Sequence, residues 1–146
     1  MDTIIVYSSM TGTTESMAEV IQDQLMEAGE NVVIKDALEV FASDLPSYGR
    51  ILIGSYTWGD GDLPDEMAPF YDELSQIDLT GKLAAVFGPG DSTYVHFAHA
   101  VDLWEEVLQR QGALMVAEGL KVDRWSNEDM GAACSHYCEE ILKIAL

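Results

Sequence analysis

Three loops of this chain combine residue types that suit a bound ligand, and the first is rich in hydroxyl groups. Ser8-Ser9-Met10-Thr11-Gly12-Thr13-Thr14 follows a short apolar run and precedes residues at helical spacing. A helix N-terminus favours an anion, because its first backbone N–H groups lack partners within the helix and its dipole is positive there. This loop could therefore bind a phosphate. A plain helix cap made by Thr13 or Thr14 is the alternative.

The absence of basic residues in this loop limits the kind of phosphate site it could form. No lysine or arginine occurs before Lys35, so neutral donors alone would bind a phosphate, unlike the P-loop of nucleoside triphosphate sites with its lysine. This argues against an enzyme that transfers phosphate. It suits a terminal monophosphate that anchors a ligand permanently.

Two later loops each place an aromatic residue beside glycine and aspartate. They read Tyr56-Thr57-Trp58-Gly59-Asp60-Gly61 and Gly88-Pro89-Gly90-Asp91-Ser92-Thr93-Tyr94. An indole in a polar turn suits a flat ligand that covers it, and Tyr94 could form the opposite wall. The alternatives are that Trp58 packs under a neighbouring helix and that Tyr94 packs on its own helix.

Strands and helices alternate along the chain and position these loops. The strand runs are apolar throughout, which is typical of strands buried on both faces, and helical crossovers between them indicate a parallel sheet in a three-layer α/β fold. Ligands bind beyond the carboxyl ends of such strands, where strand order reverses, so the loops after strands one, three and four are the candidates. We predict strands at 4–7, 32–34, 51–53, 83–87 and 114–117, helices at 17–28, 67–74, 97–108 and 130–142, and a weakly patterned connection at 36–47.

Length and charge limit the possible functions further. The 146 residues fit one domain spanning 1–146, with 26 acidic against 7 basic residues and a net charge of −19. Nucleic acid and anionic membranes would repel this chain, whereas a partner with a basic face would be attracted to it. We find neither a signal peptide nor a membrane span, and we expect a cytoplasmic monomer.

The motifs of the three loops resemble those of the flavodoxin family, in the same order along the chain. The compact fifth strand resembles the short-chain group, typical of Gram-positive bacteria. The resemblance implies a five-stranded parallel sheet of order 2-1-3-4-5, with helices on both faces, and FMN as the cofactor. It also implies a low-potential one-electron carrier rather than an enzyme.

The resemblance also assigns the parts of the cofactor site. Ser9, Met10, Thr11, Gly12, Thr13 and Thr14 would bind the FMN phosphate, and Thr57 would lie near the ribityl chain. Trp58 and Tyr94 would flank the flavin ring. Gly59 and Asp60 would lie near its N5 atom, and Asp91, Phe97 and Ala98 near its pyrimidine edge. The remaining loop residues in the site are Tyr56, Gly61, Gly88, Pro89 and Gly90.

The resemblance implies partners among larger redox proteins. A ferredoxin- or flavodoxin-NADP reductase would be the donor, and a cytochrome P450, a desaturase or a similar enzyme would be the acceptor. The alternative function is an FMN-dependent NADPH:quinone reductase of the same fold. A phosphorylation receiver domain also has five parallel strands, but Ser8-Ser9 and Tyr56-Thr57 stand where it needs acidic and phospho-acceptor residues.

Several other polar residues have a simpler interpretation. Cys134 and Cys138 are one helical turn apart on an apolar stripe and His136 lies off it, which favours core packing over a metal site. His96 and His99 could tune a pH response or could be solvated helix positions. The acidic residues Asp60, Asp62, Asp65 and Glu66 could form a solvated surface, or a docking face that also lowers a flavin potential.

Overall fold

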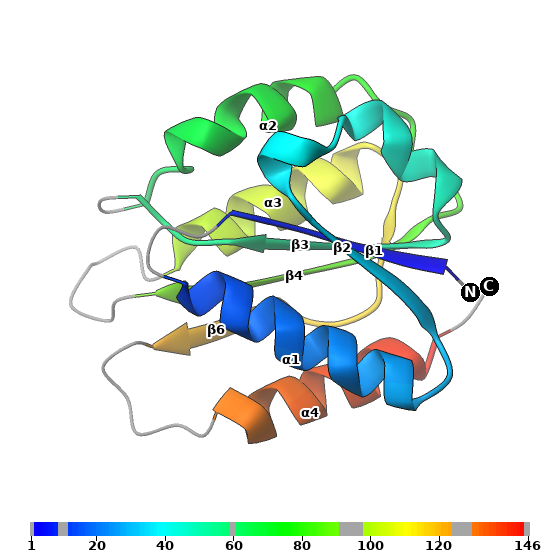
Figure 1. Cartoon of the computed structure of the whole chain (residues 1–146). Helices are drawn as coiled ribbons and strands as arrows, with labels where there is room; N and C mark the ends of the chain where they lie inside the picture. The colour runs from blue at the N-terminus through cyan, green and yellow to red at the C-terminus, as the bar shows by residue number, and fades with distance from the viewer. Residues whose placement is uncertain (1, 9–11, 59–60, 91–97, 124–129, 145–146) are drawn as a thin grey trace.

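One parallel sheet with helices on both faces forms the structure, a computed structural model that describes residues 2–8, 12–58, 61–90, 98–123 and 130–144. The strands run in the order β2-β1-β3-β4-β5, as the family resemblance implies, with β6 also paired to β4. Helices α1 and α4 cover one face, and α2 and α3 cover the other (Figure 1). The strands are β1 (Asp2–Ser8), β2 (Asn31–Asp36), β3 (Arg50–Ser55), β4 (Leu83–Gly90), β5 (Leu114–Met115) and β6 (Leu120–Asp123). The helices are α1 (Thr13–Glu27), α2 (Ala68–Leu74), α3 (His99–Arg110) and α4 (Met130–Leu142).

The apolar strand runs supply both halves of the core. Side chains alternate between the two faces of a strand, so Ile4 and Val6 of β1 pack toward α2 and α3, whereas Ile5 packs toward α1 and α4. Every residue of β3 is buried, as expected for a central strand covered on both sides. The edge strand β2 instead alternates between exposed and half-buried residues.

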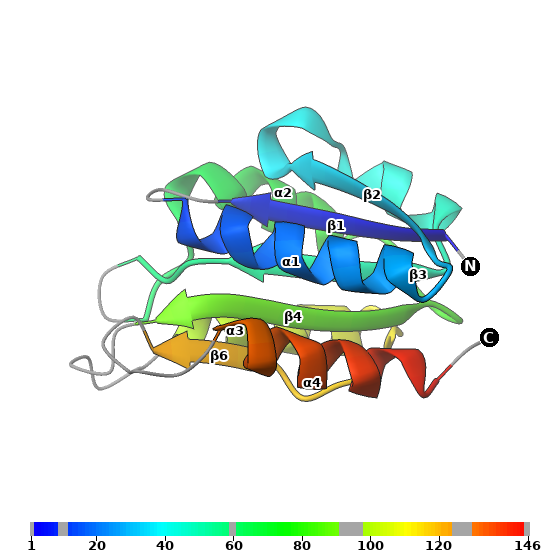
Figure 2. The ribbon, with the colours of Figure 1, turned by 60° about the horizontal axis from the view of Figure 1, so that its bottom comes forward.

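The fifth strand departs from the prediction of one run over 114–117. The observed β5 ends at Met115, and β6 continues along the same edge of β4 after an interruption (Figure 2). Met115 pairs with Ala84, and Leu120 pairs with Phe87. The chain therefore advances five residues along the edge strand while β4 advances only three. The edge therefore carries two extra residues within Val116–Gly119, as in a bulge.

Side chains from both helix layers hold this bulge. The hydroxyl of Tyr137 on α4 donates a buried hydrogen bond to the carbonyl oxygen of Val86, at 2.9 Å, opposite the interruption. On the other face, the backbone N–H of Gly119 donates to the carboxylate of Glu105 on α3. Burial nevertheless raises the pKa of Glu105, because desolvation outweighs that hydrogen bond.

The connection predicted as weakly patterned is more regular than expected. It contains two 3₁₀ helices, η1 (Ala37–Glu39) and η2 (Ala42–Ser47). Ala37, Ala42 and Leu45 are buried and anchor them to the core, and the carboxylate of Asp44 accepts a hydrogen bond from the N–H of Phe41. Anchors this short do not produce a helical period that sequence inspection can detect.

A buried arginine organises the end of the sheet where the strands begin. Arg50 opens β3 and is 1% exposed. Its guanidinium lies 3.4 Å from the carboxylate of Glu30 and donates to the hydroxyl of Thr3 and the carbonyl of Ile144. This cluster joins the start of β1 and β3 to the chain after α4.

None of the helices in the described part of the chain combines the length and the apolar character that crossing a membrane requires.

Candidate cofactor site

The carboxyl ends of β1, β3 and β4 meet at one edge of the sheet, where the candidate loops begin (Figure 1). Ser8 at the end of β1 pairs with Ser55 at the end of β3. The first two loops therefore leave the sheet side by side. This confirms the placement predicted from the alternation of strands and helices.

The start of α1 is the candidate phosphate site. Gly12 occupies the N-cap with a φ of +88°, so the helix begins at Thr13, and Thr13 and Thr14 lie in its first turn rather than at the cap. The alternative of a plain threonine cap is therefore wrong. A Cβ at Gly12 would meet nothing within 4 Å, so a side chain at this position would not be crowded by the described residues. Ser9, Met10 and Thr11 lie outside the described residues.

A short hairpin presents the first aromatic residue. The backbones of Trp58 and Asp62 exchange two hydrogen bonds, with N···O distances of 2.7 and 2.9 Å, and Gly61 adopts a φ of +121° in the turn. Trp58 is 47% exposed, so it does not pack under a neighbouring helix, and that alternative is wrong. An indole this open on a closed hairpin is suited to contact a planar ring. Gly59 and Asp60 lie outside the described residues.

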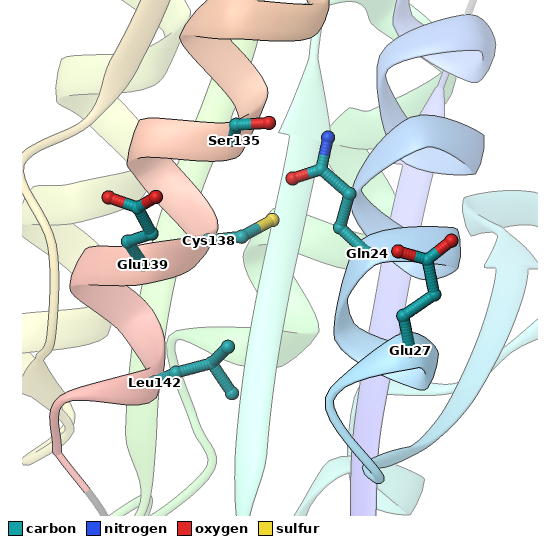
Figure 3. A pocket seen from close by; sticks show the side chains of 6 residues that line it. All are labelled: Gln24, Glu27, Ser135, Cys138, Glu139 and Leu142. Carbon is teal, nitrogen blue, oxygen red and sulfur yellow. The ribbon is translucent and has the colours of Figure 1, made fainter.

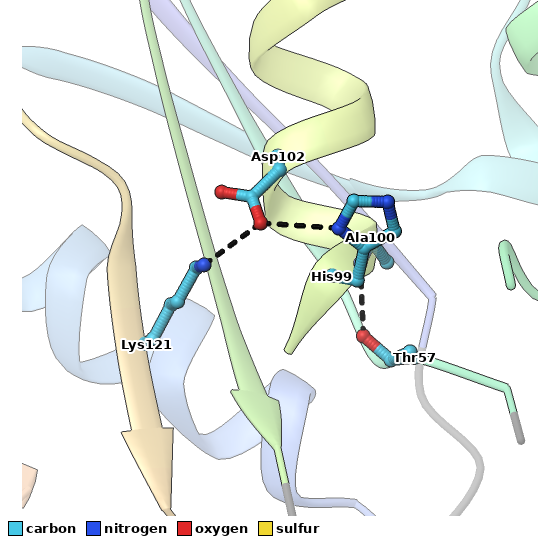
Figure 4. Close-up of polar contacts among 5 residues, drawn as sticks. All are labelled: Thr57, His99, Ala100, Asp102 and Lys121. Carbon is cyan, nitrogen blue, oxygen red and sulfur yellow. Dashed lines mark hydrogen bonds and ion pairs between the residues drawn. The ribbon is translucent and has the colours of Figure 1, made fainter. Parts of the chain in front are cut away.

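Thr57 ties this loop to the start of α3. Its hydroxyl oxygen accepts a hydrogen bond from the N–H of Ala100 at 3.0 Å, which provides a first-turn N–H of α3 with a partner (Figure 4). Ala98, just before α3, is buried and adopts a φ of +49°, an uncommon conformation for a residue with a Cβ. Two predicted site residues thus fix how α3 leaves the site.

A single carboxylate links the ends of β1 and β3. The Oε1 atom of Glu66, in the 3₁₀ helix η3 (Asp65–Met67), accepts a hydrogen bond from the hydroxyl of Ser8 at 2.5 Å. The same atom accepts a second one from the hydroxyl of Tyr56 at 3.0 Å. Burial, followed by this hydrogen bond, raises the pKa of Tyr56 to about 12. Sequence reasoning treated Glu66 only as part of an acidic surface, because nothing local connects it to Ser8, 58 positions earlier.

A second polar cluster lies beside the start of α3. One carboxylate oxygen of Asp102 is 2.8 Å from the ammonium of Lys121 on β6 and 3.2 Å from Nδ1 of His99 (Figure 4). Nothing in the sequence indicated a role for Lys121, because the strand that carries it, β6, was not predicted. His99 thus contacts Asp102 on its own helix while its side chain remains 39% exposed, and His96 lies outside the described residues.

The third loop is described only at its beginning. Gly88, Pro89 and Gly90 end β4. A Cβ on Gly88 would collide with the backbone oxygen of Ser55, so the close approach of β3 and β4 requires glycine there whether or not a ligand is bound. Asp91, Tyr94 and Phe97 lie outside the described residues.

The cysteines belong to the core, as expected. Cys134 and Cys138 are buried on α4, and neither forms a disulfide, whereas His136 is exposed. Among the described residues, no group of three or more histidine, cysteine or acidic side chains could hold a metal ion. An open hollow of about 310 Å³ lies between α1 and α4, with the thiol of Cys138 facing it (Figure 3). Burial raises the pKa of that thiol to about 12, so it remains protonated and unreactive.

The fold and this edge of the sheet define a three-layer α/β protein with a ligand site across the carboxyl ends of its strands. A sequence model of the family described as "Flavodoxin" matches residues 5–137. The chain belongs to the flavodoxin family, as its three loops indicate. FMN is the cofactor of this family, and electron transfer is its function.

Individual relatives agree along most of the chain. The protein described as "Probable flavodoxin 1" of Bacillus subtilis is 44% identical over 120 residues, covering 82% of this chain and 76% of its own. The flavodoxin of Maridesulfovibrio salexigens is 41% identical over 123 residues, covering 82% and 84%. The crystal structure of oxidised flavodoxin 1 from Bacillus cereus superposes with a TM-score of 0.95 at 41% identity, covering 100% of both chains.

The described residues fit FMN in two respects. Helix α1 begins directly after Gly12, beside the predicted phosphate loop, where the positive end of the helix dipole favours an anion. The half-exposed indole of Trp58 offers a flat apolar face for a ring at the same edge of the sheet. Ser8 and Tyr56, joined through Glu66, connect these two parts of the site.

Proposed function

We propose that this flavodoxin is a low-potential, one-electron carrier that moves between a reductase and acceptor redox enzymes. The observation that carries the proposal is the position of Trp58, half open to solvent on a hairpin whose following residues are acidic. A cofactor ring against this indole would lie at the surface, within reach of another protein's redox centre. A substrate-converting enzyme would instead be expected to enclose its ring.

The bound FMN would supply the electron chemistry, and the residues of this chain would bind and orient it. The N-terminus of α1 would hold the phosphate, with Gly12 keeping the approach clear of a side chain. Trp58 would pack on one face of the ring. Of the residues assigned by resemblance, Tyr94 would pack on the other face, with Asp91 at the pyrimidine edge.

The acidic residues beside Trp58 support both the low potential and the choice of partner. Asp62, Asp65 and Glu66 are exposed around the hairpin. Negative charge there disfavours adding electrons to the ring, which lowers its potential. The same charge, with a net −19 over the chain, would attract a basic docking face and repel a second copy.

These charges favour particular classes of partner. We propose a ferredoxin- or flavodoxin-NADP reductase as the donor and a cytochrome P450 or desaturase as the acceptor. We also propose that the protein acts as a monomer in the cytoplasm, where its two thiols would remain reduced.

Stopped-flow reduction of the FMN-loaded protein by a flavodoxin-NADP reductase tests the proposal. We expect the rate constant to fall steeply with added salt, because steering charges are screened within about 10 Å at 0.1 M. A rate indifferent to salt would contradict charge-guided docking. Rapid NADPH oxidation by the pure protein with a quinone, without any reductase, would favour a quinone reductase instead.

A further inference from the structure

Glu66 stands where the two halves of the cofactor site meet. The hydroxyl of Ser8 belongs to the last residue of β1, immediately before the predicted phosphate loop. The hydroxyl of Tyr56 stands two residues before Trp58. Both donate to Oε1 of Glu66, so one oxygen atom fixes the spacing between the exits of two neighbouring strands.

In both contacts a hydroxyl group is the donor and the carboxylate of Glu66 is the acceptor. Neither hydroxyl needs to change its ionisation, and a carboxylate is the acceptor that two donors can share at short distance. Ser8 is 2% exposed, so water competes poorly for its hydroxyl, whereas the contact between Tyr56 and Glu66 lies at the surface. The raised pKa of Tyr56 is consistent with a phenol that stays protonated as a donor.

We propose that Glu66 is a positioning residue for the cofactor, holding the exit of the phosphate loop and the Trp58 hairpin in one arrangement before FMN binds. The inference rests on the loop assignments made above and concerns FMN binding alone. It therefore survives even if electron transfer to a protein partner is not observed.

Substitution of Glu66 should change FMN affinity in opposite directions depending on whether the residue acts as a positioning group or only as a charge. An acidic side chain near the site repels the FMN phosphate, so removing its charge alone should leave binding unchanged or make it tighter. Removing the acceptor from two positioned donors should make it weaker. Asp65 is a matched control, because it precedes Glu66, is exposed and acts on Tyr56 through its charge rather than a hydrogen bond.

The experiment titrates the apoprotein with FMN and follows the quenching of flavin fluorescence. We expect Glu66→Met to raise the Kd about tenfold, roughly the value of one net hydrogen bond. Glu66→Gln, which keeps an acceptor oxygen, should raise it less. Asp65→Asn should bind FMN as tightly as the wild type or more tightly. If Glu66→Met also binds as tightly or more tightly, Glu66 acts only as a charge and the proposal is overturned.

A second set of variants tests the two contacts directly. In a Ser8→Ala/Tyr56→Phe background both donors are gone, so adding Glu66→Met should weaken FMN binding no further. An undiminished tenfold loss in that background would overturn the proposal. Thermal unfolding of each apoprotein checks that the variants fold. If Glu66→Met does not fold, the single variants Ser8→Ala and Tyr56→Phe replace it, and each is expected to bind FMN more weakly than the wild type. Unchanged FMN affinity in both variants would overturn the proposal.

Discussion

The hydroxyl of Tyr137 reaches across from α4 and donates to the backbone oxygen of Val86, 2.9 Å away, at the place where the edge strand is interrupted. Burial raises the pKa of Tyr137 well above its ordinary value, so the phenol remains a donor. A side chain here supplies the hydrogen bond that a continuous fifth strand would have made. The stability of the sheet edge thus depends on a residue outside the sheet.

Removing this hydroxyl should destabilise the protein measurably. Tyr137→Phe keeps the ring, which packs edge-on against Phe87, but leaves a buried carbonyl without its partner. We expect a loss of about 1 to 3 kcal/mol in the free energy of unfolding, measured by urea denaturation. Tyr71→Phe is the control, since Tyr71 is half-buried and packs against Trp104 through its ring. Equal effects of the two substitutions would contradict the role of the Val86 contact.

Alkaline pH should weaken the contribution of Tyr56. Its pKa rises from 10.0 to about 12 in the folded protein, mainly through burial and then through the hydrogen bond to Glu66. Because the folded-state pKa is the higher one, the stabilisation is complete below pH 10.0 and is lost as the pH rises through about 12. The stability difference between wild type and Tyr56→Phe should therefore shrink across that window. Urea midpoints of both proteins at stepped pH measure it, and a constant difference would count against the shift.

The buried ion pair at the opposite end of the sheet should be sensitive to the loss of one partner. Glu30→Gln would leave the guanidinium of Arg50 without its countercharge, and we expect a loss of about 1 to 3 kcal/mol. This is less than for a fully buried pair, because Glu30 is 18% exposed. The exposed Glu27 provides the control, and a loss no larger than that of Glu27→Gln would show that the pair contributes nothing.

The N-cap of α1 allows a charge test of the phosphate site. Gly12→Asp and Gly12→Asn impose similar strain, because both place a side chain at a φ of +88°. Only the first places a negative charge at the helix N-terminus. We expect FMN to bind about tenfold or more weakly to Gly12→Asp than to Gly12→Asn, and riboflavin, which lacks the phosphate, to bind the two equally. An equal FMN affinity for both variants would place the phosphate elsewhere.

The sequence predicted the parts of this protein that depend on local pattern. Apolar strand runs such as Ile51–Ile53 and the periodic helix around Trp104 indicate a layered parallel sheet with loops at the strand ends. The strand order came instead from the family resemblance. The contacts of Glu66 and Lys121 depend instead on segments that only folding brings together. The interrupted fifth strand was missed because the register shift arises against β4, and Val116 and Ala117 read as a continuation of the strand.

The interruption between β5 and β6 also affects the tendency of the protein to aggregate. An exposed sheet edge is a template on which a second chain can add a strand and begin to aggregate. Here the edge consists of a two-residue and a four-residue segment whose registers differ. No incoming strand could hydrogen-bond to both without repeating the bulge. The same two extra residues that require Tyr137 therefore make this edge a poor template for a second chain.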